Sequence, residues 1–262
     1  MHIAITRQVS PSIADCQLSY IPRQPIDLDL AVRQHAQYEA LLTRLGCQVL
    51  QLPAQPQMPD SVFVEDAAIV LEELAIITRP GAPSRRAETL SIAAALEPYR
   101  RLVFIEEPGT VDGGDVLRVD HSIYVGITQR SNLHAIEQIR QVLQPYGYAV
   151  IGVPVTGCLH LKSAVTQVKK DTLLINPVWV AKASFAGMSF IEVHPDEPHA
   201  ANALLIGESV IYPASSPRTA KRLEEHNVPV FAVDVSELEK AEGAVTCCSL
   251  IFEADAIHGE RV

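Results

Sequence analysis

The stretch GGDVLRVDHSIYVGIT, residues 113–128, contains two short β-rich runs separated by a polar turn, the pattern of a β-hairpin. Apolar residues then recur at helical spacing over residues 131–147, and the strand-like run YAVIGVPV follows at 148–155. This part of the chain therefore predicts a ββαβ unit.

The same order of elements recurs with a period of about 45 residues. Hairpins are expected at 61–80, 159–177 and 201–216. Helices are expected at 84–99 and 217–227, with a shorter helical piece after residue 177. The closing strands are expected at 101–107, 189–195 and 228–235. A fifth unit starts at 245–254 near the end of the chain, and residues 2–7, 28–45 and 47–53 supply its missing strand, helix and strand.

These repeats predict an α/β fold in which five ββαβ units form a ring that the N- and C-terminal segments close together. Closure of a ring removes exposed sheet edges. An ordinary doubly wound α/β sheet is the alternative. No linker-like or low-complexity stretch divides the chain, so a single domain over residues 1–262 is expected.

The first strand of each unit is expected to begin at a polar residue, with steps of 46, 48, 42 and 45 residues between these positions: Asp66, Asp112, His160, Asn202 and Cys247. Equivalent positions of a pseudosymmetric ring gather around its axis. We therefore expect Asp66, Asp112, His160 and Cys247 to meet at one place, although they lie far apart in the sequence.

Bulk composition narrows the possible partners. The chain has 262 residues, of which 48% are hydrophobic and 20% charged, and its formal net charge is -10. This charge disfavours nucleic acids and anionic membranes and mildly favours a cationic small molecule. The start MHIAITRQVS lacks the pattern of a signal peptide, and no apolar run reaches the ~18 residues of a membrane span.

The chain has five cysteines, an odd number, and two of them, Cys247 and Cys248, are adjacent. Adjacent cysteines rarely bridge one another without strain, so the sequence predicts reduced thiols and a cytoplasmic protein. A zinc site from Cys158, His160, Cys247 and Cys248 is disfavoured, because paired Cys-x-x-Cys spacing is absent. Free cysteine also packs as a small hydrophobe, and strand alternation favours this core role for Cys248.

Cysteine, histidine and carboxylates at one place suggest covalent chemistry. A thiolate needs a cationic neighbour or substrate, His160 can act as acid or base near neutral pH, and Asp112 can fix its imidazole. The acids of PDSVFVED, residues 59–66, would repel one another unless a cation such as a guanidinium neutralised them. The residue types therefore favour attack by sulfur on a guanidine carbon. Alternatively, these residues have only structural roles. His160 would then be a hydrogen-bonded structural residue, VDGGDVL a turn at the start of a strand, and FVED an acidic segment exposed to solvent.

Several motifs resemble the dimethylarginine dimethylaminohydrolase family of the guanidine-modifying (pentein) superfamily. They are VFVEDAA, ITRPGAPSRR, GTVDGGDVL, QRSN, GCLHLKS and SELEKAEGAVTCCS, which together cover most of the chain from about residue 60 to 250. GAPSRR combined with TCCS is more specific to this family than to the wider superfamily. The resemblance implies the five-bladed α/β propeller of the family, in agreement with the repeats.

The resemblance also implies roles for individual residues. Cys247 matches the nucleophile, His160 the general acid and base, and Asp112 the acid that partners the histidine, where some members have Glu. The matched substrate-binding positions are Asp60, Glu65 and Asp66 for the guanidinium, Arg85 and Arg130 for the substrate carboxylate, Leu18 of an irregular lid loop at residues 10–25, and Ala241.

The activity that the resemblance implies is hydrolysis of Nω-methylated arginine, either asymmetric dimethylarginine or monomethylarginine, to citrulline and dimethylamine or methylamine. The route would pass through a covalent S-alkylthiouronium on Cys247, with neither metal nor cofactor. An arginine deiminase or amidinotransferase on the same fold is the nearest alternative. A non-catalytic pentein binding module is the alternative from another class, but such modules lack the Cys, His and Asp set.

Overall fold

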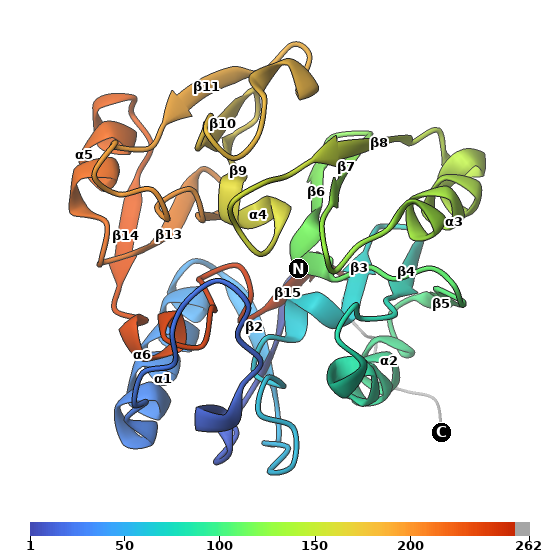
Figure 1. Ribbon diagram of the computed structural model, residues 1–262, viewed down its shortest axis with the longest axis horizontal. Helices are drawn as coiled ribbons and strands as arrows, with labels where there is room; N and C mark the ends of the chain where they lie inside the picture. The colour runs from blue at the N-terminus through green and yellow to red at the C-terminus, as the bar shows by residue number, and fades with distance from the viewer. Residues whose placement is uncertain (255–262) are drawn as a thin grey trace.

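The computed structural model describes residues 1–254, so the end of the predicted 1–262 domain lies outside the described residues. In this range the strands form five three-stranded sheets, which surround a common centre with most helices on the outside (Figure 1). Within the described range there is no helix long and apolar enough to cross a membrane.

Each sheet belongs to one of the predicted units. The first contains β3 (Ala68–Val70), β4 (Leu74–Ile77), the 3₁₀ helix η3 (Pro83–Glu88), α2 (Thr89–Leu96) and β5 (Arg101–Phe104). The second contains β6 (Val116–Val119), β7 (Ser122–Ile127), α3 (Leu133–Leu143), η5 (Gln144–Tyr146) and β8 (Ala149–Pro154). The third contains β9 (Val165–Lys169), β10 (Thr172–Ile175), η6 (Lys182–Ser184) and β11 (Ser189–Glu192). The fourth contains β12 (Leu204–Ile206), β13 (Ser209–Pro213), α5 (Pro217–Glu225) and β14 (Val230–Val233).

The fifth unit is built from both ends of the chain, as predicted. It contains β15 (Leu250–Glu253), β1 (His2–Arg7), α1 (Leu28–Arg44) and β2 (Cys47–Leu52), and its sheet has the order β15-β1-β2. In all five sheets the first two strands pair antiparallel and the last two pair parallel. A helix or loop crossover is needed to join parallel strands, which explains the ββαβ order.

The ring is held together by apolar clusters at the junctions between successive sheets. The middle strand of each sheet is buried on both faces: in β7, for example, Ile123 and Val125 pack toward the first unit, whereas Tyr124 packs toward the third. The same alternation in the other middle strands produces five clusters among the described residues, one for each junction. Because one of them joins the fifth unit to the first, the ring is closed.

Two local expectations were wrong. The polar residues do not begin the first strands: Asp66 lies in the 3₁₀ helix η2 (Val64–Ala67), Asp112 caps η4 (Gly113–Asp115), and His160 caps α4 (Leu161–Ala164). A helical turn therefore separates each of them from its strand. Cys247 precedes β15 in a turn, so strand alternation does not apply to the cysteine pair. The shorter helical piece expected in the third unit is confirmed, as the 3₁₀ helix η6.

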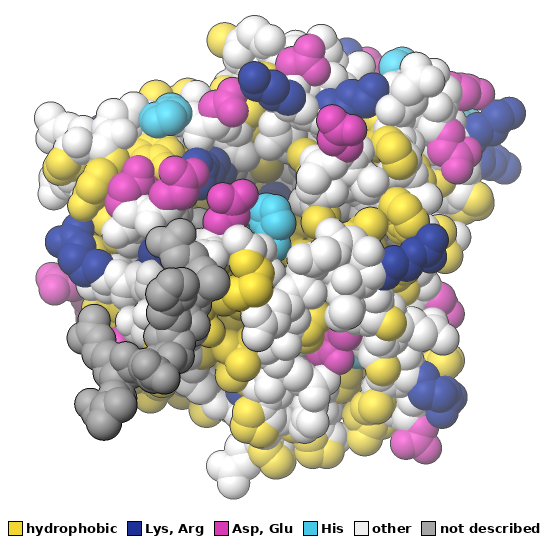
Figure 2. All heavy atoms as spheres, turned by 180° about the vertical axis from the view of Figure 1, so that it is seen from behind, with side chains coloured by type: hydrophobic (Ala, Val, Ile, Leu, Met, Phe, Trp, Pro, Cys, Tyr) yellow, Lys and Arg dark blue, Asp and Glu magenta, His cyan; other side chains and the backbone are white. Residues whose placement is uncertain are grey.

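The surface charge is mixed. On the face opposite to that of Figure 1, Lys and Arg side chains are dispersed among acidic and apolar ones (Figure 2). This distribution agrees with the net charge of -10 and differs from the clustered basic patch of a nucleic-acid-binding surface.

Candidate active site

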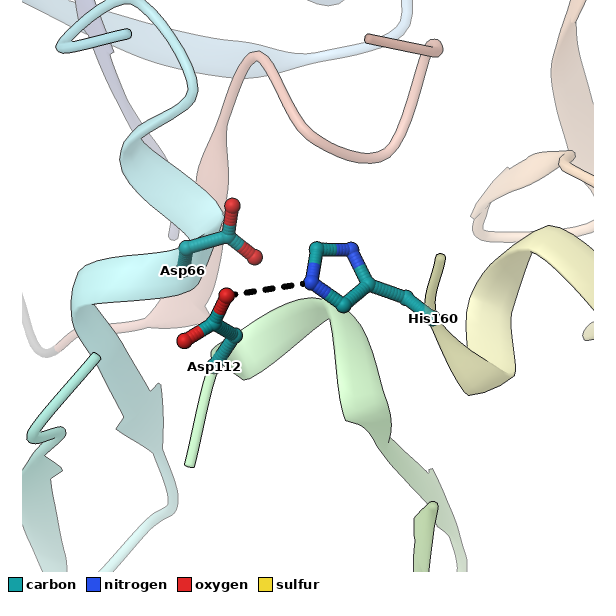
Figure 3. A group of neighbouring side chains, drawn as sticks. All are labelled: Asp66, Asp112 and His160. Atoms are coloured by element: carbon teal, nitrogen blue, oxygen red, sulfur yellow. Dashed lines mark hydrogen bonds and ion pairs between the residues drawn. The ribbon is translucent and has the colours of Figure 1, made fainter. Parts of the chain in front are cut away.

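The helical turns at the start of three units bring Asp66, Asp112 and His160 together near the centre of the ring (Figure 3). One side-chain donor or acceptor atom of each residue lies within 4.8 Å of the others, and all three residues are buried. The residues lie 46 and 48 positions apart in the sequence. Their meeting is a consequence of the ring, because each belongs to a different unit.

His160 and Asp112 form a buried hydrogen-bonded pair, with 3.1 Å between Nε2 of the imidazole and Oδ2 of the carboxylate. Burial alone would lower the pKa of His160, but the carboxylates of Asp66, Asp112 and Asp115 outweigh burial and raise it to about 9. The imidazole is therefore a cation at neutral pH and can donate a proton.

The Gly113–Gly114 pair makes this approach possible. A Cβ atom at Gly114 would lie 2.6 Å from Nδ1 of His160, and one at Gly113 would lie 1.9 Å from the backbone oxygen of Glu65. The amide of Gly114 also donates to Oδ1 of Asp66 at 2.9 Å. The VDGGD turn thus packs its backbone directly against the imidazole, which a larger residue would prevent.

Asp66 is ion-paired to Arg85 at 2.5 Å, and the same guanidinium contacts Glu88 at 2.9 Å. Arg85 is only 4% exposed, and it also donates to the backbone oxygens of Asp60 and Phe63. Burial would raise the pKa of Asp66, but the charges of His160 and Arg85 hold it well below its usual range. Asp66 is therefore ionised, and its buried charge is matched by two cations.

Glu65 lies on the neighbouring side of the site. Its carboxylate accepts from Lys162 at 2.5 Å and from the hydroxyl of Thr246 at 2.8 Å. Burial raises the pKa of Glu65, although Lys162 opposes this effect. Asn202, the polar residue of the fourth unit, bonds both Lys162 and Thr246 rather than joining the histidine cluster. The fourth unit therefore supports the site without facing His160.

Cys247 is 8% exposed, and its backbone oxygen accepts from the amide of Glu65 at 3.1 Å. Burial and the negative charges of Glu65 and Asp66 raise the pKa of its thiol to about 12. Cys247 does not belong to the group of Asp66, Asp112 and His160 whose side-chain atoms lie within 4.8 Å of one another, but the negative charge of Asp66 raises the pKa of both Cys247 and His160. Cys248 is fully buried, and its sulfur lies 3.5 Å from the backbone oxygen of Ala244. Its burial agrees with the core role that the sequence favoured for it.

The segment at residues 10–25, the lid expected from the sequence, contacts two of the predicted substrate-binding residues. The amide of Gln17 donates to both carboxylate oxygens of Asp60, at 3.1 and 3.2 Å. Arg130 lies between the lid and the catalytic cluster, because it contacts Oγ of Ser19 at 3.5 Å and Oδ2 of Asp112 at 3.3 Å. Leu18 is half-buried between these two anchored positions.

Ala241 is buried at the end of α6 (Ser236–Glu239), on the chain segment that leads to Cys247. Of the predicted guanidinium-binding acids, Asp60 is the one that bonds the lid, and burial raises its pKa. The carboxylates and arginines expected from the sequence therefore lie around the site. Arg85 holds Asp66 and Glu88, whereas Arg130 reaches the lid.

Within residues 1–254, Asp66, Asp112 and His160 are the side chains close enough to share a metal ion. They suit a metal poorly, because a protonated imidazole has no lone pair to offer and Asp66 and Asp112 already pair with Arg85 and Arg130. Neither Cys158 nor the cysteine pair belongs to this group.

Sequence reasoning missed several residues that support the site. Asp115 is completely buried and accepts from the amide of Leu161 and the hydroxyls of Thr128 and Ser131, which ties the second unit to the start of α4. Burial raises its pKa to about 6. Lys162 was also missed, although the LHLKS motif contains it. Nothing in the sequence indicated that Glu88 pairs with Arg85.

Comparison with known proteins agrees with this geometry. The family model described as "N,N dimethylarginine dimethylhydrolase, eukaryotic" matches residues 16–182. The N(G),N(G)-dimethylarginine dimethylaminohydrolase of Streptomyces coelicolor is 40% identical over 249 residues, which are 94% of this chain and 95% of that protein. The enzyme of the same name from Pseudomonas aeruginosa is 35% identical over 95% of this chain and 98% of its own.

The crystal structure of a cysteine-to-serine mutant of the Pseudomonas aeruginosa enzyme, complexed with citrulline, superposes with a TM-score of 0.90 at 34% identity, over 95% of this chain and 98% of that one. Five ββαβ units around a buried histidine and carboxylate cluster place the chain in the class of α/β enzymes that this solved structure represents. Within this class, the chain belongs to the dimethylarginine dimethylaminohydrolase family.

Proposed function

We propose that the protein hydrolyses Nω-methylated arginine, as asymmetric dimethylarginine or monomethylarginine, to citrulline and dimethylamine or methylamine. The observation that carries the proposal is the buried, hydrogen-bonded pair of His160 and Asp112 in a chain of this family. The negative charge of Asp66 acts on this pair and on Cys247, because it raises the pKa of both His160 and the thiol. The citrulline bound to the Pseudomonas aeruginosa mutant supports the identity of the product.

In this proposal the carboxylates of Asp60, Glu65 and Asp66 orient the guanidinium of the substrate. They are buried, and two of them lie beside Cys247, so a planar cation there would gain charge-assisted hydrogen bonds. Arg130 and Arg85 receive the substrate carboxylate, and Leu18 and Ala241 contact the amino-acid end. Arg130 suits this role because it lies directly under the lid, near Ser19.

The charge of the substrate would activate the nucleophile. With a thiol pKa of about 12, Cys247 is protonated in the free enzyme at neutral pH. A bound guanidinium adds a positive charge near the thiol and opposes the acids that raise its pKa. Binding of substrate therefore releases a proton from Cys247 and generates the thiolate where it is needed.

The thiolate then adds to the guanidine carbon and forms a C–S bond. Protonated His160, held by Asp112, donates its proton to the methylated nitrogen, and the C–N bond breaks to release the amine. A cationic S-alkylthiouronium remains on Cys247. Neutral His160 next takes a proton from water as its oxygen attacks the same carbon and forms a second tetrahedral species. The C–S bond then breaks, the hydroxyl proton of this species passes to the departing sulfur, and citrulline and the protonated Cys247 thiol of the free enzyme are formed. The proposal requires neither metal nor organic cofactor.

A substrate comparison tests the proposal against the other enzymes of this fold. Citrulline formation is measured with asymmetric dimethylarginine, monomethylarginine and unmethylated arginine at equal concentrations. We expect the methylated substrates to be hydrolysed with the higher kcat/KM. A preference for arginine would favour a deiminase, and transfer of the amidino group to an added amine would favour an amidinotransferase. Absence of turnover with all three, together with no labelling of Cys247 by a thiol-directed inactivator, would favour a binding module.

The localisation, domain organisation and partners of the protein are part of the same proposal. Because all five cysteines are free thiols, we place the protein in the cytoplasm. Because apolar clusters join every pair of successive sheets, we describe it as one catalytic domain. The partner is a small methylated arginine, and the net charge of -10 disfavours nucleic acid and anionic membranes.

A further inference from the structure

One carboxylate holds three successive amides of the lid. The amide of Ser19 donates to Oε2 of Glu242 at 2.9 Å, and the amides of Tyr20 and Ile21 both donate to Oε1, the latter at 2.8 Å. Glu242 follows α6, whereas the lid belongs to the N-terminal part of the chain, more than 220 residues away. Hydrogen bonds to an ionised acceptor are roughly twice as strong as neutral ones, so these bonds are a substantial anchor.

The backbone at Glu242 is unusual. Its φ is +58°, a left-handed conformation that residues other than glycine rarely adopt. Glycine is the usual residue at such a helix end, and a glycine is indeed next in the sequence. A residue larger than glycine does not fit at position 243, because its Cβ would lie 2.1 Å from the ring of Phe63. The left-handed conformation is instead adopted by Glu242. Its backbone is strained, and its side chain bonds the lid.

The same few lid residues contact the substrate site on their other side. Gln17 bonds Asp60, and Ser19 contacts Arg130, both of which are predicted to bind substrate. Leu18 lies between these two contacts. The lid is thus held from two directions: by residues of the site, and by Glu242 on the segment that leads to Cys247.

We propose that Glu242 is a positioning residue that latches the lid over the substrate and sets the affinity for the amino-acid end. It touches no reacting atom and acts through the backbone of residues 19–21. This inference rests on the proposed function for its effect on catalysis, whereas the latch itself is a property of the free protein.

Two variants distinguish the effect of the Glu242 carboxylate from the effect of its backbone conformation. Glu242→Gly removes the carboxylate and relieves the left-handed strain, and Glu242→Gln keeps the side-chain shape without the charge. The matched control is Glu239→Gln, which changes a carboxylate on the same segment that bonds Ser215 rather than the lid. The measurements are amide hydrogen exchange of residues 16–25, thermal unfolding, and kcat and KM for asymmetric dimethylarginine.

For Glu242→Gly we expect an unchanged or higher melting temperature, exchange at residues 19–21 faster by about tenfold or more, and a KM raised about fivefold or more, with kcat altered less. Glu242→Gln should show smaller changes in the same direction, and Glu239→Gln should behave as wild type. Unchanged exchange at residues 19–21 in both Glu242 variants would overturn the latch. Faster exchange with an unchanged KM would overturn its role in substrate affinity. If wild-type protein does not turn over dimethylarginine, the proposed function fails, and hydrogen exchange still decides the latch.

Discussion

Nε2 of His160 lies 3.1 Å from Oδ2 of Asp112, and this buried pair connects the third unit of the ring to the second. The neighbouring carboxylates raise the pKa of His160 to about 9, against burial. A cationic imidazole and a thiol that is protonated in the free enzyme together suit an enzyme whose substrate brings its own positive charge. The pair also makes the protonation of His160 part of the stability of the fold.

Asp112→Asn should therefore lower kcat by about a hundredfold or more and lower the pKa of His160, because the imidazolium loses a hydrogen-bonded anion. The pKa of His160 is raised on folding, so its contribution to stability is present below pH ~6.5 and is lost as pH rises toward 9. In the variant this loss should occur at lower pH. The measurements are kcat as a function of pH, histidine NMR titration and urea unfolding. Exposed Asp171→Asn is the control, and an unchanged titration of His160 would contradict the assignment.

Cys247→Ser should abolish turnover and leave the fold intact, because serine is too weak a nucleophile to replace a thiolate here. Cys248→Ser should keep substantial activity, but it places a hydroxyl in the apolar core and should cost about 1–2 kcal/mol of stability. Citrulline formation and thermal unfolding measure the two effects. Active Cys247→Ser with inactive, well-folded Cys248→Ser would reassign the nucleophile.

Asp66→Asn should destabilise the fold by about 3 kcal/mol, because it removes an anion from the buried Arg85 guanidinium. The pKa of Asp66 is depressed in the folded state, so its stabilising contribution is present above pH ~4 and is lost as pH falls. Wild type should therefore lose more stability than the variant in acid. Glu72→Gln, which breaks an exposed pair with Arg118, should change stability by less than about 1 kcal/mol. Equal effects of both substitutions in urea unfolding would refute the buried-pair explanation.

Gly114→Ala should reduce kcat strongly, since the added methyl group would lie 2.6 Å from Nδ1 of His160 and displace the imidazole. KM should change less, because the added methyl group meets His160 and Asp66 rather than Arg130 or the lid. Gly152→Ala is a milder control, in which the added Cβ meets only side-chain methyl groups at 3.3 Å or more. Steady-state kinetics of the two variants give the comparison. A fully active Gly114→Ala would mean that the imidazole position is not critical.

Much of the fold was predictable because its cause is local. Strand alternation and apolar helical spacing repeat in each unit, and the middle strands bury both of their faces, so the units could be recognised and the fifth assembled from both ends. The short turns η2, η4 and α4 were not predictable, since three or four residues carry too little periodicity to distinguish a helical turn from the start of a strand. These turns decide where Asp66, Asp112 and His160 point.

The sequence by itself determined the five-unit order of the chain and the types of residue near its centre, because both are recorded in patterns that neighbouring residues define. Only the tertiary structure decided which charges meet. Arg85 pairs with Asp66 and Glu88, Lys162 pairs with Glu65, and Glu242 holds the lid. The contact of Glu65 with Lys162, 97 residues away, joins the first unit to the third and depends on how the units pack around the centre of the ring. That packing arises from apolar clusters at every junction. No local pattern specifies such a contact.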